Sequence, residues 1–262
     1  MTIHLPRYAL AVVIAVLPIG AAADSNKAVA IVERIRRADY EGDRAALQRL
    51  YTELEPFTHT RDLSPRIRYW RGFSLWRRVL NGFNESADAR ELEQDLTQAV
   101  NEFEQAFFDD PKLVDAKVGA VACLGGLIFL NQGNQPRLQE LIPRSGTLLK
   151  EAQAAEPDNI RMLWVRGAVQ WYVGPERGGG QAAAIATYEK GLALARQRKR
   201  PEADPLMPSW GEPELLMSLA WSSLNKTPGC RRRAKVCNRG PGDRVVLALC
   251  PGHPAAPDSR EA

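Results

Sequence analysis

NEFEQAFFDDP, residues 101–111, is the stretch that decides how this chain folds, together with Ala99 just before it. Ala99, Phe103 and Ala106 follow one another at intervals of four and three residues, which places them on one face of a helix. Alanines on that face let a second helix approach closely. Pro111 then ends the helix, because proline lacks the amide hydrogen that would continue it. The stretch therefore predicts a helix that packs tightly against a neighbour.

The same spacing returns further along the chain. Tyr188 follows Ala184 by four residues, and a weaker copy runs from Ala152 to Pro157. The pattern A-x3-F with a closing proline is the second-helix signature of the tetratricopeptide repeat, so residues 27–226 resemble that superfamily in a degenerate form. The resemblance implies an all-α, TPR-like α-solenoid of antiparallel helix hairpins, in which the aromatic residue fills the wedge between hairpins.

Helical periodicity divides this region into about four and a half hairpins. Gly72 and Gly167 fall at the small-residue position of two first helices. The alanine that matches Gly72 lies 27 residues later, further than the repeat places it, so we expect an insertion to lengthen that hairpin. A proline-rich bridge, residues 201–208, precedes the last expected helix. The expected helices cover residues 27–38, 43–54, 64–82, 90–109, 113–131, 136–155, 159–174, 181–200 and 212–225.

The amino terminus has the pattern of a secretory signal peptide. Arg7 precedes an apolar run over residues 8–20, and three alanines end at Ala23. The run is shorter than the ~20 apolar residues that a membrane span needs. We expect cleavage after Ala23 and export to the periplasm or cell envelope, with a retained membrane anchor as the alternative. The expected domains are a signal peptide (1–23), a TPR-like domain (24–226) and an irregular basic tail (227–262).

The net charge of +4 is confined to the ends of the chain. Residues 227–262 carry seven Lys or Arg against three Asp or Glu, and Arg7 adds one positive charge, which leaves residues 24–226 with a net charge of −1. A nearly neutral body lacks the electrostatic footprint of a nucleic-acid-binding protein. We therefore expect no nucleic-acid partner and, after signal cleavage, no stable membrane insertion.

Residues 227–262 break the repeat pattern. They hold three of the four cysteines, clustered glycine and proline, and no sustained periodicity. The expected helix over 212–225 would need a partner to cover its apolar face. One hypothesis is a frameshift near Thr227, because one permitted codon choice for residues 244–259 reads, one base on, as ASYWHYVRDILLPQIR. In that case the solenoid is truncated or frameshifted at its C-terminus. The alternative is a genuine disordered tail.

The sequence offers little material for catalysis or for metal and cofactor binding. Beyond the signal peptide only His59 and His253 remain, and neither stands beside a serine or cysteine nucleophile. The tail cysteines lack the C-x2-C pairs of a zinc site. The glycine-rich segment 174–180 lacks the Lys and Ser/Thr of a Walker loop and is typical of a helix connector. We expect no enzyme, cofactor or metal, although paired-carboxylate hydrolysis stays open.

Aromatic residues provide the best functional lead. Tyr69, Phe73 and Trp76 share one helix face, and Trp164 and Trp171 share the equivalent face two hairpins later. The resemblance implies that first helices line a concave groove, and rigid aromatic area beside arginine suits binding. A register shift of one residue would instead make the stripe interhelical core, and that alternative stays open. The candidate groove residues are Arg66, Tyr69, Phe73, Trp76, Arg77, Arg161, Trp164, Trp171 and Tyr172.

These observations lead to ranked functional predictions. The first is a non-catalytic scaffold that binds a protein or peptide partner in the periplasm or cell envelope. The alternative is a small-molecule-binding accessory protein of a solute uptake system, and an enzyme comes third. Trp210 has no place in the stripe, and we expect it to staple the turn before the last helix.

Overall fold

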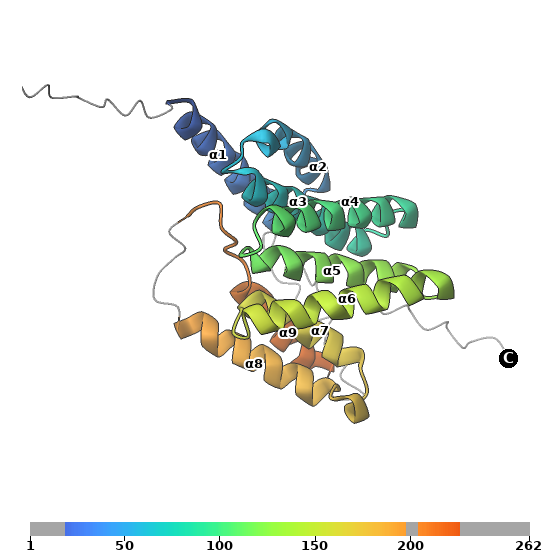
Figure 1. Ribbon diagram of the computed structural model, residues 1–262. Coiled ribbons are helices and arrows are strands. Elements are labelled where there is room, and N and C mark those ends of the chain that lie inside the picture. Colours follow the sequence, from blue (N-terminus) through green and yellow to red (C-terminus); the bar gives the residue numbers. More distant parts are fainter. Residues whose placement is uncertain (1–18, 198–203, 226–262) are drawn as a thin grey trace, which may run out of the picture.

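The computed structural model describes residues 19–197 and 204–225, and these residues form helices and turns without any strand (Figure 1). The all-α fold class is thereby confirmed. The apolar run of the signal peptide and the tail with its frameshift hypothesis lie almost wholly outside the described residues and stay predictions. The elements are α1 (Ile19–Glu41), α2 (Arg44–Glu53), η1 (Glu55–His59), α3 (Ser64–Asn84), α4 (Ala89–Asp109), α5 (Val114–Leu130), α6 (Gln135–Ala155), α7 (Ile160–Tyr172), η2 (Pro175–Arg177), α8 (Gln181–Gln197) and α9 (Glu212–Asn225).

Consecutive helices pair as hairpins that stack on one another, with α3 against α4, α5 against α6 and α7 against α8 (Figure 1). Side-chain caps begin several of these helices where the sequence predicts a start. Asp43 accepts a hydrogen bond from an amide of α2, Asp88 from two of α4, and Asn159 from two of α7. Within the described residues no helix is both long and apolar enough to cross a membrane.

Glycine and alanine residues allow neighbouring helices to approach closely, as the sequence predicts. A Cβ added to Gly72 would lie 3.1 Å from the Ala99 carbonyl oxygen and equally close to the Phe103 ring. The same ring lies 2.5 Å from the Cβ position of Gly119 on the next hairpin. Phe103 therefore fills the wedge between α3 and α5, as the resemblance implies. This packing supports a helical-repeat architecture, and membership of the tetratricopeptide-repeat superfamily stays a resemblance.

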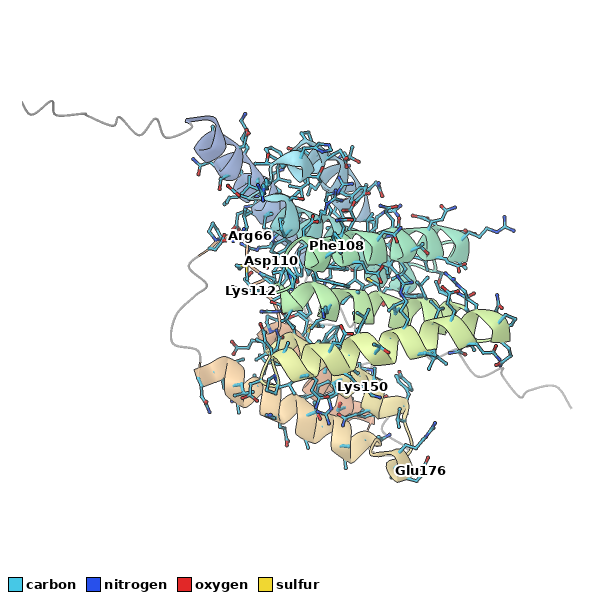
Figure 2. All side chains as sticks on the ribbon, in the orientation of Figure 1. Arg66, Phe108, Asp110, Lys112, Lys150 and Glu176 are labelled. Atoms are coloured by element: carbon cyan, nitrogen blue, oxygen red, sulfur yellow. The ribbon has the colours of Figure 1, made fainter. Side chains whose placement is uncertain are left out.

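One irregular segment departs from the hairpin stack. Residues 204–211, here called the strap, lead into α9 and run from beside α1 along one side of the stack (orange in Figure 1). Residues 198–203, which join α8 to the strap, lie outside the described residues. Arg66, at the start of α3, points to the side on which the strap passes (Figure 2) and pairs with Asp204, with 2.7 Å between Nε and Oδ2.

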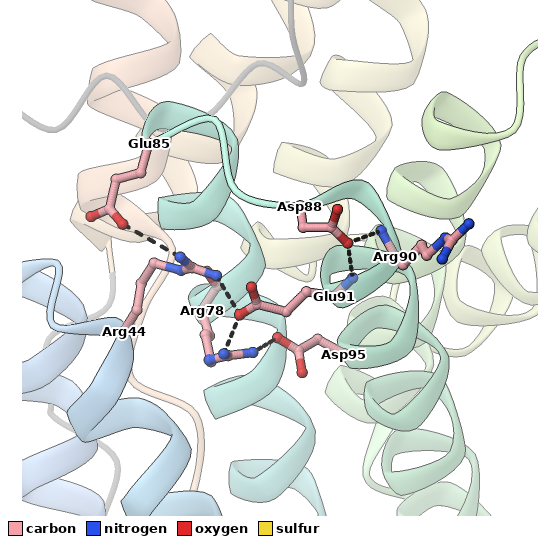
Figure 3. A network of polar contacts seen from close by, with 7 residues as sticks. All are labelled: Arg44, Arg78, Glu85, Asp88, Arg90, Glu91 and Asp95. Atoms are coloured by element: carbon pink, nitrogen blue, oxygen red, sulfur yellow. Dashed lines mark hydrogen bonds and ion pairs between the residues drawn. The ribbon is translucent and has the colours of Figure 1, made fainter.

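The expected insertion is absorbed as extra helical length, since α3 and α4 each have 21 residues. A charge network ties α2 to this longer hairpin (Figure 3). Arg44 donates to Glu91 at 2.7 Å and lies 3.5 Å from Glu85, while Arg78 pairs with Glu91 and Asp95. Several charges that share partners hold their geometry better than an isolated surface pair. The network thus fixes the first hairpin against the lengthened one.

Candidate functional site

A cluster of aromatic side chains forms where the first helices of two hairpins meet the strap. Along α3, neighbouring rings lie 5.0 to 6.4 Å apart between centroids. Trp76 lies 5.9 Å from Trp164 of α7, so the cluster connects hairpins that are distant in sequence. Such spacing falls in the range of favourable aromatic pairs. The aromatic cluster consists of Tyr69, Trp70, Phe73, Trp76, Trp164 and Trp210.

Trp210 lies at the centre of the cluster although it belongs to the strap. Its ring centroid is 5.3 Å from that of Trp76, 5.7 Å from Trp164 and 6.2 Å from Phe73. Its indole nitrogen donates to the Tyr69 hydroxyl at 2.6 Å, and its side chain is only 7% exposed. Burial raises the pKa of the Tyr69 phenol, which therefore stays protonated, and its oxygen accepts this bond through a lone pair.

Two arginines beside the cluster are paired within the helix stack. Arg161 forms a two-pronged pair with Asp115, at 2.7 and 2.6 Å, and donates to the Trp210 carbonyl oxygen at 3.0 Å. Arg77 donates to Asp39 at 2.6 Å and lies 3.4 Å from Glu214. Burial raises the pKa of Asp39, and Arg77 opposes that shift. These pairs fix the cluster's frame, because breaking one would leave a buried charge alone.

Two less buried arginines, Arg36 and Arg66, also have partners on the strap. Arg36 donates to the Pro205 carbonyl oxygen at 2.9 Å, and its guanidinium lies 4.9 Å from the centre of the Trp70 ring. It also pairs with the exposed Glu33 of its own helix. Arg66 pairs with Asp204 of the strap. Removal of the strap would therefore take away the carboxylate partner of Arg66 and the carbonyl partner of Arg36, which would keep Glu33. Arg77 and Arg161 would keep their carboxylates.

The remaining predicted groove residues lie at the far end of α7. Trp171 is half-buried and meets Trp221 of α9 with 4.8 Å between ring centroids. Tyr172 is 60% exposed. The ring contact of Trp171 is thus with α9, away from the aromatic cluster. The nine predicted residues thus divide into a central group around Trp210 and this separate pair.

The sequence left open whether the central aromatics line a groove or form interhelical core, and in the described structure their side chains are buried. Tyr69, Phe73, Trp76 and Trp164 are between 1% and 5% exposed. Trp210 of the strap contacts all four, and Ser218 of α9 accepts a hydrogen bond from Trp164. Trp210 does more than staple a turn, since it completes the cluster. Helical spacing does not predict this role, although the apolar Leu206 in the proline-rich bridge and Trp210 just after it were a signal. Whether the cluster binds a ligand stays a prediction.

Other features of the described residues do not point to a competing site. A shallow polar depression on α4 is lined by Arg90, Glu93, Gln94, Thr97 and Gln98, and it shares no residue with the aromatic cluster. Within residues 19–197 and 204–225, no three His, Cys, Asp or Glu side chains are placed to hold a metal ion. Burial strongly raises the pKa of the Cys123 thiol, which is consistent with a packing role.

Comparison with known proteins gives a structural likeness. No family model matches the chain, and no curated protein sequence matches it. The fold is similar to that of the HusA haemophore from Porphyromonas gingivalis, with a TM-score of 0.56 and 16% sequence identity. The match covers 76% of this chain and 94% of the haemophore chain. At this identity the likeness shows a shared all-helical fold.

Proposed function

We propose that this protein is an exported, non-catalytic binding protein whose ligand is a small planar aromatic acid of the porphyrin class. The observation that carries the proposal is the aromatic cluster flanked by Arg36 and Arg66, each of which has a partner on the strap. The rings that now contact the Trp210 indole can stack on a flat ligand, and Arg36 and Arg66 suit carboxylates at the ligand's edge. The likeness to a haemophore supports a small-molecule role over a protein-binding scaffold.

Binding is expected to rest on ring stacking and on pairing between arginine and carboxylate. The test compares protoporphyrin IX with its dimethyl ester, using quenching of tryptophan fluorescence in the purified protein. The free acid should bind about tenfold more tightly, the value of one modest charge-assisted hydrogen bond. Neither compound binding at micromolar concentration would contradict the proposal.

A variant comparison locates the carboxylate site. Arg36→Gln and Arg66→Gln should each reduce the preference for the acid over the ester. The preference is a ratio measured on one protein, so any change in strap position affects both ligands and cancels. The matched control is Arg137→Gln on α6, whose partner Glu140 lies on the same helix. It should keep the full preference. An unchanged ratio in all three variants would place the carboxylates elsewhere.

A second candidate is the peptide partner predicted from the sequence, and the strap itself favours it. Side chains of the helix stack donate to the carbonyl oxygens of Pro205, Leu206 and Trp210, as a groove would to an extended peptide. Unlabelled peptides that contain a proline-rich segment followed by tryptophan should then displace bound porphyrin. If porphyrin binds and such peptides do not displace it, the peptide-binding function is rejected and the small-molecule function remains.

A further inference from the structure

The strap makes contacts of the same kinds that the proposed ligand would make. Its Asp204 carboxylate pairs with Arg66, and its Trp210 ring occupies the middle of the aromatic cluster. Between these points, the Pro205 and Leu206 carbonyl oxygens accept hydrogen bonds from Arg36 and Trp70, at 2.9 and 2.7 Å. One segment of the chain thus presents an anion and a flat ring to the receptor groups that a planar aromatic acid would use.

The strap is attached in a way that allows it to leave. Its hydrogen bonds to α1, α3 and α7 come from side chains, and in the described residues no backbone–backbone hydrogen bond joins it to the helices that precede it. Its own turn is internal, since the Met207 amide donates to the Asp204 carbonyl oxygen at 3.0 Å. Displacement of the strap would therefore break no helix–helix pairing.

The junction with α9 is suited to a pivot. Gly211 has a φ of +129°, a backbone conformation open mainly to glycine, and its amide donates to Glu214 at 2.7 Å. A Cβ at this position would lie 2.9 Å from Ile160 Cδ1. The chain thus turns sharply between the strap and α9, which packs on α8 and α7. A rotation at Gly211 could move the strap while α9 stays in place.

We propose that residues 204–211 are an autoinhibitory strap: Trp210 and Asp204 occupy the aromatic site in competition with the ligand, and ligand binding expels them. The inference rests on the proposed function, because it concerns the same site. A site that is open in only a fraction of molecules binds with an affinity reduced by that fraction. Loosening the strap must therefore tighten ligand binding, the reverse of what loss of a binding residue does.

The first test uses Asp204→Asn and protoporphyrin IX. Asp204 is partly exposed, so the substitution should fold normally while it weakens the hold on Arg66. We expect affinity to rise about two- to fivefold, as the strength of an exposed ion pair implies. The control is Asp158→Asn, which removes a similar surface pair with Lys190 and should leave affinity unchanged. Equal affinity in the wild type and Asp204→Asn would overturn the inference.

Trp210→Ala tests the aromatic half of the competition. The variant should bind protoporphyrin IX at least about tenfold more tightly, because the ligand no longer has to displace the indole. Thermal unfolding is followed in parallel. A variant that unfolds at a lower temperature and also binds more weakly would show that Trp210 is only a structural part of the cluster, and would refute the autoinhibitory role.

Proteolysis supplies a readout that does not depend on affinity. Chymotrypsin can cleave after Leu206 and Trp210 only when the strap is accessible. Protoporphyrin IX should accelerate these cleavages in the wild type, while cleavage after the exposed Phe108 of α4 serves as the internal control. Binding accompanied by protection of the strap would reject the inference and leave the proposed function standing. Absence of binding in the wild type, Asp204→Asn and Trp210→Ala alike would reject both.

Discussion

Gly167→Ala tests whether the hairpin stack has the register described above. A Cβ at Gly167 of α7 would lie 2.3 Å from Cε1 and 2.7 Å from Cδ1 of Tyr188 on α8. Contacts this short cannot persist, and the Tyr188 ring is buried, so it cannot swing into solvent. The added methyl group must therefore push α7 and α8 apart. Gly146 of α6 is the matched control, because a Cβ there meets nothing within 4 Å.

Two opposing effects set the size of the change. Overpacking a close helix contact costs about 1–3 kcal/mol. Alanine is better than glycine inside a helix by about 1 kcal/mol. Gly146→Ala should show only the second effect and increase the free energy of unfolding by about 1 kcal/mol. Gly167→Ala shows both, so it should be less stable than Gly146→Ala by about 1–3 kcal/mol.

The assay is urea unfolding followed by circular dichroism at the helical minimum, with thermal unfolding as a second measurement. For a domain of this size, 1 kcal/mol corresponds to a shift of about 2–4 °C in Tm. The denaturant slopes of both variants should match that of the wild type, which would show that only stability has changed. If Gly167→Ala were stabilised as much as Gly146→Ala, α7 and α8 would not meet at this glycine.

Further predictions concern the aromatic cluster and its frame. Trp164→Ala should lower the free energy of unfolding by about 3–5 kcal/mol in urea titrations, since it empties a buried site. A change below about 1 kcal/mol would instead favour the interpretation of Trp164 as part of an open groove. Arg161→Gln should cost about 3–5 kcal/mol, because Asp115 is left buried without its partner, and Arg161→Met combined with Asp115→Leu should recover most of it. Burial raises the pKa of Tyr69 in the folded protein above its value near 10 in the unfolded chain. The contribution of the neutral phenol to the free energy of unfolding is therefore complete below pH 10. It is lost as the pH rises further, at a rate that approaches about 1.4 kcal/mol per pH unit. In Tyr69→Phe the loss of stability between pH 10 and 11 should be smaller by about 1 kcal/mol, because the unfolded phenol is only half ionised at pH 10, and an identical pH profile would contradict the assignment.

The helices were predictable from sequence because their signals are local. Asn159 lies immediately before the α7 that it caps, and Ala184 and Tyr188 lie one helical turn apart. Helical spacing also placed Tyr69 and Trp76 correctly on one face. The same spacing says nothing about what covers that face, because periodicity records only which residues point the same way.

The strap could not be predicted for a related reason. Residues 204–211 have no periodicity, and their contacts join positions far apart, such as Trp210 with Tyr69, 141 residues away. Such contacts depend on the finished stack, since the receptor surface exists only when α3 and α7 lie together. The sequence reading of Trp210 as a turn residue was therefore incomplete, and its proximity to Phe73 and Trp164 came from the structure.

Covering the aromatic cluster meets two physical demands that an open groove would not. A bare face of tryptophan, tyrosine and phenylalanine would be an exposed apolar patch, the kind of surface that promotes association. A strap held by side-chain contacts removes that patch while leaving the helix pairing independent of it. It also sets a threshold: if the strap were closed in about 99% of molecules, the observed affinity would fall about 100-fold below that of the open site. Weakly stacking molecules would then be excluded, and only a ligand able to replace both the indole of Trp210 and the carboxylate of Asp204 would open the site.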